Sequence, residues 1–266
     1  MEIKGKRVLL TGAAGGLGRA IARTLHANGA QLVLSGRNVS ALDALSKELN
    51  AQVVTCDLAD AADIAKLVAA AGEIDVLVAN AGIAATAPLT DFSAEEIDQL
   101  LDVNLRAPIL LSQAFIESMK QRGGGHLVFV SSMAGKGASP LQGLYSASKF
   151  GLRGFTQCLR MDLRSSNIGV STIFPGMIRD AGMFADAGLP PPPGVGTNTS
   201  EEVAQAVLRA IQRNLGEVSV APMVMRFASV LAALAPEASA AMVRAAGAEK
   251  FAEQFAEKYA AGRRKS

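Results

Sequence analysis

The stretch Arg7-Val-Leu-Leu-Thr-Gly-Ala-Ala-Gly-Gly-Leu-Gly18 joins an apolar strand pattern to the start of a helical pattern. Glycines at positions 12, 16 and 18 allow a tight turn between the two elements and let the backbone approach a pyrophosphate. The N–H groups and the dipole of a helix N-terminus favour negative charge at that point. The stretch therefore indicates a strand-to-helix crossover that can bind a nucleotide.

The first 80 residues repeat this strand and helix alternation. The pattern predicts strands at 7–11, 31–35, 52–55 and 75–79, with helices at about 16–28, 39–49 and 60–72. Apolar strands that lack polar alternation and are separated by helices are typical of a parallel sheet covered on both faces. A chain of 266 residues, half of them apolar, is compatible with one α/β domain of this kind.

Composition excludes several classes of protein. The formal charge is +2 with both signs interspersed, so no nucleic-acid partner is expected. Cys56 and Cys158 form neither a disulfide framework nor a metal-ligand cluster. His26 and His126 lie near no nucleophile in the sequence, and we expect both to be non-catalytic. The first apolar run stops at the glycine loop, too early for a signal peptide, so a cytoplasmic location is expected.

A second motif, Tyr145-Ser-Ala-Ser-Lys149, begins thirteen residues after Ser132. If 144–165 is helical, Tyr145 and Lys149 lie one turn apart on the same face. A phenol has a pKa of about 10, and a nearby cation favours its phenolate form. A motif this short is by itself more often a surface pair, so its chemistry depends on what surrounds it.

These motifs together resemble the short-chain dehydrogenase/reductase family over residues 3–221. They are the Thr11-Gly-x-x-x-Gly-x-Gly18 loop, Asp57 after the third strand, Asn80-Ala-Gly82, Asn104, Ser132, Tyr145-x-x-x-Lys149 and Pro175-Gly176. The resemblance implies an α/β, three-layer, doubly wound Rossmann fold with a seven-stranded parallel sheet. We expect residues 1–222 to form this domain, with a substrate lid at 177–200, and 223–266 to form a helical C-terminal extension of the same domain.

The resemblance also implies an activity, the hydride transfer that interconverts a carbonyl (ketone or aldehyde) and an alcohol. Tyr145 would transfer the proton, Ser132 would polarise the substrate oxygen, and Lys149 would lower the phenol's pKa and bind the cofactor's ribose. Asn104 would hold a water on the proton route, although its place in an apolar run also fits a satisfied core amide. Two other functions remain open: a catalytically silent NADP(H)-binding sensor or scaffold, and a dehydratase or epimerase.

The end of the second strand bears on the choice of cofactor. An acid there would bind the adenosine ribose hydroxyls, whereas Arg37 offers a charge-assisted fork to a 2′-phosphate. We therefore expect NADP(H) rather than NAD(H). Asp57 is expected to face the adenine, with a helix cap as the alternative. The implied cofactor-binding residues are Gly12, Gly16, Leu17, Gly18, Arg37, Asp57, Leu58, Asn80, Gly82, Tyr145, Lys149, Pro175, Gly176 and Ile178.

One stretch departs from the family pattern. The family commonly has Thr shortly after Pro175-Gly176 to bind the carboxamide, and this chain has Arg179-Asp180. The backbone N–H of Ile178 is the alternative donor, and whether Arg179 reaches the cofactor's phosphates stays open.

Residues 180–199 show little periodicity, which is typical of a lid or a binding loop. Apolar side chains in and around this stretch predict a lipophilic substrate, unless several of them only pack the lid down. They are Met133, Leu141, Leu144, Met177, Ile178, Met183, Phe184 and Leu189.

Two apolar segments follow the last predicted strand. Charged residues and a proline interrupt 223–246 too often for a membrane span. Phe251, Phe255 and Tyr259 mark one face of an amphipathic helix, which we expect to pack on its own domain or on a sister subunit rather than on a membrane surface. The resemblance implies a homodimer or homotetramer that pairs through helices at 94–121 and 144–166.

Overall fold

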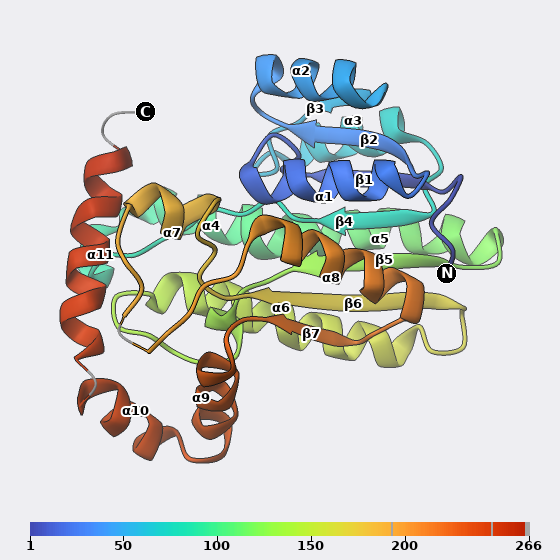
Figure 1. Cartoon of the computed structure of the whole chain (residues 1–266). Coiled ribbons are helices and arrows are strands. Elements are labelled where there is room, and N and C mark those ends of the chain that lie inside the picture. The colour runs from blue at the N-terminus through green and yellow to red at the C-terminus, as the bar shows by residue number, and fades with distance from the viewer. Residues whose placement is uncertain (193, 246, 264–266) are drawn as a thin grey trace.

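Seven parallel strands form one sheet in the order β3-β2-β1-β4-β5-β6-β7 in the computed structural model, which describes residues 1–192, 194–245 and 247–263 (Figure 1). The strands are β1 Arg7–Thr11, β2 Gln31–Gly36, β3 Gln52–Thr55, β4 Val76–Ala79, β5 Gly125–Val130, β6 Ile168–Pro175 and β7 Glu217–Val220. The predicted doubly wound parallel sheet is therefore confirmed.

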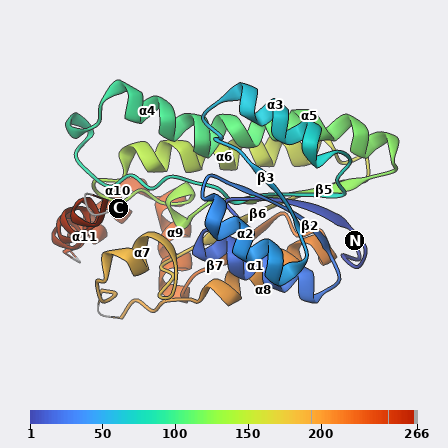
Figure 2. The same ribbon diagram turned by 90° about the horizontal axis from the view of Figure 1, so that it is seen from above.

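Helices cover both faces of the sheet (Figure 2). One face carries α1 Gly16–Ala27, α2 Val39–Leu49 and α8 Ser200–Arg213, and the other carries α3 Ala61–Ala71, α4 Ala94–Leu101, α5 Ala107–Gln121 and α6 Gly143–Asp162. In β1, Val8 and Leu10 belong to one core cluster and Leu9 to the other. Because each strand is buried on both sides, its sequence shows no polar alternation.

The strand order reverses between β1 and β4. These two strands are neighbours, yet the chain continues from β1 to β2 and β3 on one side and from β4 to β5, β6 and β7 on the other. The connections leave the sheet in opposite directions there, which opens a crevice at the carboxyl ends of the two strands.

The helix predicted at 94–121 is interrupted. A π-helical turn, Asp102–Arg106, separates α4 from α5, and the N–H of Ala107 bonds the carbonyl of Asp102 five residues back. Pro108 has no N–H to donate to the carbonyl of Asn104, four residues earlier, so a regular α-helical bond cannot form there. This wide turn holds Asn104.

The segment 177–200 is less irregular than its sequence predicts, because it contains a short helix, α7 Gly182–Ala187. Its two ends lie together: Asn198 N–H donates to the Met177 carbonyl (2.9 Å), and Arg179 N–H donates to the Asn198 carbonyl (3.0 Å). The segment thus leaves the end of β6 and returns to the same place before α8.

Three helices, α9 Met223–Leu234, α10 Pro236–Ala245 and α11 Ala248–Arg263, form the predicted C-terminal extension. Helix α11 packs against α7 and buries Ala252 and Phe255, while the side chain of Tyr259 lies outside those described. Helix α9 buries none of its side chains, and Met223, Phe227 and Leu234 are 73%, 70% and 80% exposed along one stripe. No helix in the described ranges has the length and hydrophobicity to cross a bilayer.

His126 lies at the amino end of β5, far along the strand from the crevice. The side chain is 2% exposed, and its Nε2 lies 2.8 Å from Ser171 Oγ. Burial lowers the pKa of His126 from 6.5 to about 3, with the charges of the N-terminus and Arg160 adding to the effect. The folded protein therefore keeps this imidazole neutral, whereas the unfolded chain protonates it below pH 6.5.

Acidification should for this reason destabilise the fold through His126. Between pH 7 and pH 5 the unfolded state gains a proton that the folded state does not take up, which removes about 2 kcal/mol of unfolding free energy. We expect the His126→Gln variant to be less stable at pH 7 but to lose less stability over this interval, as measured by urea unfolding. His26→Gln, in an exposed position on α1, is the matched control. Equal slopes for His126→Gln and the parent would contradict this account.

Candidate active site

The crevice between β1 and β4 has a volume of about 410 Å³, within the range of small-molecule sites. Nine of the residues implied for cofactor binding line it, namely Gly12, Gly16, Leu17, Gly18, Arg37, Asp57, Leu58, Asn80 and Gly82. They come from the ends of four different strands and from the start of α1. The structure thus brings together residues that are spread over the first 82 positions.

The glycine loop is shaped for close backbone approach. Gly12 has a φ of 64°, and a Cβ there would lie 2.8 Å from the Cα of Ala81. A Cβ on Gly18 would collide with the carbonyl oxygen of Gly12. Helix α1 has no side-chain cap and no acidic residue in its first turn, so its N–H groups and dipole face the crevice and suit an anion such as a pyrophosphate.

Gly16 has a further neighbour. A Cβ on this glycine would lie 2.5 Å from the Cβ of Ala181, and Gly182 also lines the crevice. The segment 177–200 therefore rests directly on the glycine loop.

Arg37 extends from the end of β2 at the rim of the crevice. Its guanidinium is exposed and makes no hydrogen bond or ion pair with any other residue that the structure describes. Asn38, next in sequence, accepts from the Ala41 N–H and caps α2. A free guanidinium at this position can form a fork to a phosphate.

Asp57 does not cap α3, because that position belongs to Asp60, whose side chain accepts from the Ala62 N–H. The Asp57 carboxylate instead accepts from the Ala59 N–H at 3.0 Å and lines the crevice beside Leu58. The alternative of a helix cap is therefore wrong, and the adenine position stays a prediction.

Asn80 joins the ends of β1 and β4. Its amide donates to the carbonyls of Thr11 (3.0 Å) and Gly12 (3.2 Å), and the Thr11 hydroxyl accepts from the N–H groups of Asn80 and Ala81. The Thr11 hydroxyl is a structural partner that the sequence alone did not single out. Together these bonds fix the crevice at the switch point.

Asn104 is 1% exposed and has all of its amide atoms paired. Its Oδ1 accepts from the Ile83 N–H (2.7 Å), and its Nδ2 donates to the Ile83 carbonyl (2.8 Å) and to Ser148 Oγ (3.2 Å). A Cβ on Gly82 would lie 3.3 Å from Asn104 Oδ1 and 3.4 Å from Lys149 Nζ. The amide is therefore both satisfied and close to Lys149. The role of Ser148 had no signal in the sequence.

Tyr145 and Lys149 lie on the first turns of α6, as the spacing predicts. Lys149 Nζ lies 5.6 Å from the centroid of the Tyr145 ring and 3.3 Å from the Val130 carbonyl, and the lysine is 3% exposed. Burial lowers the pKa of Lys149 from 10.5 to about 8. At pH 7 this group is still mainly an ammonium ion beside the tyrosine.

Ser132 follows β5 and precedes a short 3₁₀ turn, Met133–Gly135, that packs against α6. Its Oγ accepts from the Ala134 N–H at 3.1 Å. The hydroxyl hydrogen therefore remains able to donate to a substrate oxygen.

Residues Pro175 to Asp180 lead from β6 into the segment 177–200. The Gly176 N–H donates to the Val220 carbonyl. Met177 and Arg179 make the hydrogen bonds to Asn198 that join the two ends of the segment. The N–H of Ile178 has no acceptor among the residues that the structure describes. Arg179 donates to the Thr197 carbonyl, and Asp180 accepts from the Ser200 N–H and hydroxyl at the start of α8. Arg179 and Asp180 thus fasten the segment's ends.

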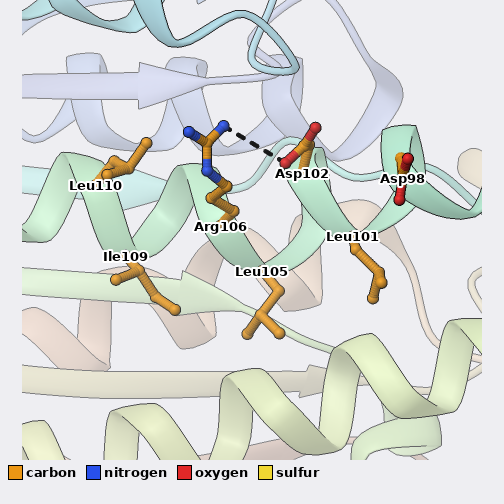
Figure 3. A pocket seen from close by; sticks show the side chains of 7 residues that line it. All are labelled: Asp98, Leu101, Asp102, Leu105, Arg106, Ile109 and Leu110. Carbon is orange, nitrogen blue, oxygen red and sulfur yellow. Dashed lines mark hydrogen bonds and ion pairs between the residues drawn. The ribbon is translucent and has the colours of Figure 1, made fainter.

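A second hollow lies on the outer surface of α4, the π-helical turn and α5 (Figure 3). Leu101, Leu105, Ile109 and Leu110 supply most of its lining, beside the ion pair of Arg106 with Asp102 (3.5 Å). It contains none of the implied catalytic or cofactor-binding residues.

Comparison with known proteins gives a consistent picture. Residues 6–189 match the family model for short chain dehydrogenase. The chain is 37% identical over 250 residues to the Mus musculus dehydrogenase/reductase SDR family member 7B (86% of this chain, 77% of that protein). It is 37% identical over 181 residues to the 3-oxoacyl-[acyl-carrier-protein] reductase FabG of Rickettsia conorii (67% and 75%).

Among solved structures, a metagenomic short-chain oxidoreductase in complex with NADP superposes with a TM-score of 0.71 at 33% identity, covering 84% of this chain and 99% of that one. The family model, the relatives and the fold agree. The chain therefore belongs to the short-chain dehydrogenase/reductase family of oxidoreductases.

Proposed function

We propose that the protein is an NADP(H)-dependent oxidoreductase that interconverts a carbonyl and an alcohol on a lipophilic substrate. The observation that carries this proposal is the buried ammonium of Lys149, which lies beside the Tyr145 ring and next to the glycine-lined crevice. Burial of a lysine without a carboxylate partner does not stabilise a fold. A nearby cation does stabilise the ionised form of a phenol that must give up its proton.

The crevice fits a dinucleotide. The glycines admit a pyrophosphate against the start of α1, and the unpaired Arg37 would bind a 2′-phosphate. The NADP in the related metagenomic structure supports this choice. The bound nicotinamide would supply or accept the hydride, and the Ile178 N–H is the proposed donor to its carboxamide.

Four side chains would act on the substrate and its proton. Tyr145 would donate its phenolic proton to the carbonyl oxygen during reduction, and Lys149 would stabilise the phenolate that remains. The Ser132 hydroxyl would donate a hydrogen bond to the same oxygen. Asn104, held beside Lys149, would position a water on the path by which the proton is replaced.

A lipophilic substrate is proposed from the segment 177–200, which we treat as a lid. Met183 on α7 lies 3.7 Å from the Thr86 hydroxyl, and the loop after Ser132 is joined to the loop after β4 by the Ala87 N–H and the Leu141 carbonyl (3.0 Å). The contact of Met183 with the loop after β4 supports an apolar lining that the lid shares with the catalytic loop. A relative that reduces 3-oxoacyl groups supports the same choice.

We further propose a homo-oligomer that pairs through α5 and α6. Phe150 and Met161 on α6 are 43% and 67% exposed, and the hollow on α4 and α5 is mainly apolar. Light scattering after size-exclusion chromatography tests this, and a monomer at micromolar concentration would contradict it.

Replacement of the phenol tests the chemistry. Tyr145→Phe should lower the rate of carbonyl reduction by at least about a hundredfold, because the proton donor is lost, and should leave NADPH binding intact. Steady-state NADPH consumption and fluorescence titration measure the two effects. Tyr259→Phe, which alters the only other tyrosine of the sequence, is the matched control.

Three results are distinguishable in that assay. A parent protein that binds NADPH but turns over no carbonyl would favour a sensor or scaffold. Conversion of a substrate without consumption of cofactor would favour a dehydratase or epimerase. Equal rates for Tyr145→Phe and the parent would exclude the proposed role of the phenol.

Arg37 should determine which dinucleotide is preferred. Arg37→Ala removes a charge-assisted contact with the 2′-phosphate, so KM for NADPH should rise by about tenfold or more, while KM for NADH changes little. Lys47→Ala removes the same charge at the far end of α2 and should change neither value. An unaltered NADPH to NADH ratio in Arg37→Ala would show that the guanidinium does not bind the phosphate.

The apolar side chains of the proposed lid should determine which ketones the enzyme prefers. Ketones with long alkyl or aryl groups should give higher kcat/KM values than short polar ketones, by about tenfold for every two additional buried methylene groups. A panel assayed with NADPH and NADH in parallel measures this. Preference for the short polar ketones would refute the lipophilic assignment.

A further inference from the structure

An ion-pair cluster lies next to the site but outside the residues named so far. Lys136 Nζ lies 2.8 Å from a carboxylate oxygen of Glu217 and donates to Ser219 Oγ (3.2 Å). The other oxygen of Glu217 accepts from Arg153 Nε (2.8 Å) and from Gln157 Nε2 (2.9 Å). We call Lys136, Glu217 and Arg153 the Glu217 cluster.

The cluster joins three elements, and two of them carry proposed catalytic residues. Lys136 follows the Met133–Gly135 turn that begins at Ser132, and Arg153 lies one turn after Lys149 on α6. Glu217 begins β7, the edge strand of the sheet. A single carboxylate therefore connects the serine loop to the helix of Tyr145 and Lys149.

The cluster is partly shielded from water, most of all at Lys136. The side chains of Lys136, Glu217 and Arg153 are only 14%, 27% and 28% exposed, and Lys136 Nζ lies 4.1 Å from the centroid of the Phe174 ring. Burial alone would raise the pKa of Glu217, but the hydrogen bonds from Arg153 and Lys136 keep its pKa below the ordinary value. Charge pairs in such a setting are screened less than surface pairs.

The serine loop also fits closely against α6. A Cβ on Gly135 would lie 2.7 Å from the carbonyl oxygen of Lys149 and 2.9 Å from Ser131 Oγ. The loop can reach this position only because residue 135 has no side chain.

We propose that the Glu217 cluster positions Ser132 relative to Tyr145 and Lys149 by holding the Met133–Gly135 turn against α6. None of Lys136, Glu217 and Arg153 lines the crevice, so we treat them as positioning residues. The expected effect of the cluster on kcat rests on the proposed function. The expected effect on the position of the Met133–Gly135 turn rests on the structure alone.

The first test replaces Glu217 with a residue of the same shape. Glu217→Gln keeps the shape of the side chain, removes the charge that Lys136 and Arg153 share, and replaces one of the two acceptor oxygens with an amide NH2 donor. We expect kcat for carbonyl reduction to fall by about tenfold, because a small displacement of an orienting group is costly, while the Kd for NADPH stays the same. Glu48→Gln breaks an exposed ion pair of similar length with Arg23 (2.7 Å) between α1 and α2 and should leave kcat unchanged. Lys136→Met should behave like Glu217→Gln, and Lys136→Arg should restore most of the rate.

The second test separates positioning from a loss of stability. In a Ser132→Ala background, Glu217→Gln should lower kcat by less than about twofold, since the group that it positions is absent. A fall in kcat as large as in the parent background would overturn the proposal.

Hydrogen exchange at the amides of residues 133–136 gives a readout that needs no substrate. Exchange there should be faster in Glu217→Gln than in Glu48→Gln, and equal exchange would overturn the proposal even if the parent reduced no carbonyl. Inactivity of the parent towards every carbonyl would refute the proposed function alone.

Discussion

The buried ammonium group of Lys149 is the charge around which the site is built. A drop in pKa from 10.5 to about 8 corresponds to about 3 kcal/mol of lost hydration. Among the described residues no carboxylate offsets this loss, and the group lies beside the Val130 carbonyl, the Tyr145 ring and Gly82. The end of β5, helix α6 and Gly82 therefore surround a charge whose burial by itself is unfavourable. Such an arrangement is typical of a group retained for chemistry rather than for stability.

Small residues set the distances at this site. Gly82 lies between Asn104 and Lys149, Gly12 lies against Ala81, and Gly135 lies against the carbonyl of Lys149. Each glycine lets two backbone segments, or a backbone and a charged group, approach more closely than a side chain would permit. The polar groups supply the chemistry, and the glycines supply the separations at which it can operate.

The sequence predicted the layers, the sheet and the crevice because apolar strands, helix periodicity and the glycine loop are local patterns. It placed Tyr145 and Lys149 on one helical face for the same reason. The π-helical turn at Asn104 could not be read from periodicity, because one wide turn shifts the apolar spacing of a long helix too little to be detected. Short α7 lies in a stretch of small residues and prolines without a detectable period. The partners Ser148 and Glu217 lie 44 and 81 residues from Asn104 and Lys136, and only the folded chain brings them together.

Helix α9 carries apolar side chains that the fold does not bury. Met223, Phe227 and Leu234 contribute almost nothing to the core because they are more than two-thirds exposed. Their replacement by polar residues should therefore change the free energy of unfolding very little. It would also remove an exposed apolar stripe that promotes aggregation in concentrated solution. The stripe is thus a convenient place to improve the handling of the protein for crystallisation without touching the crevice or its lid.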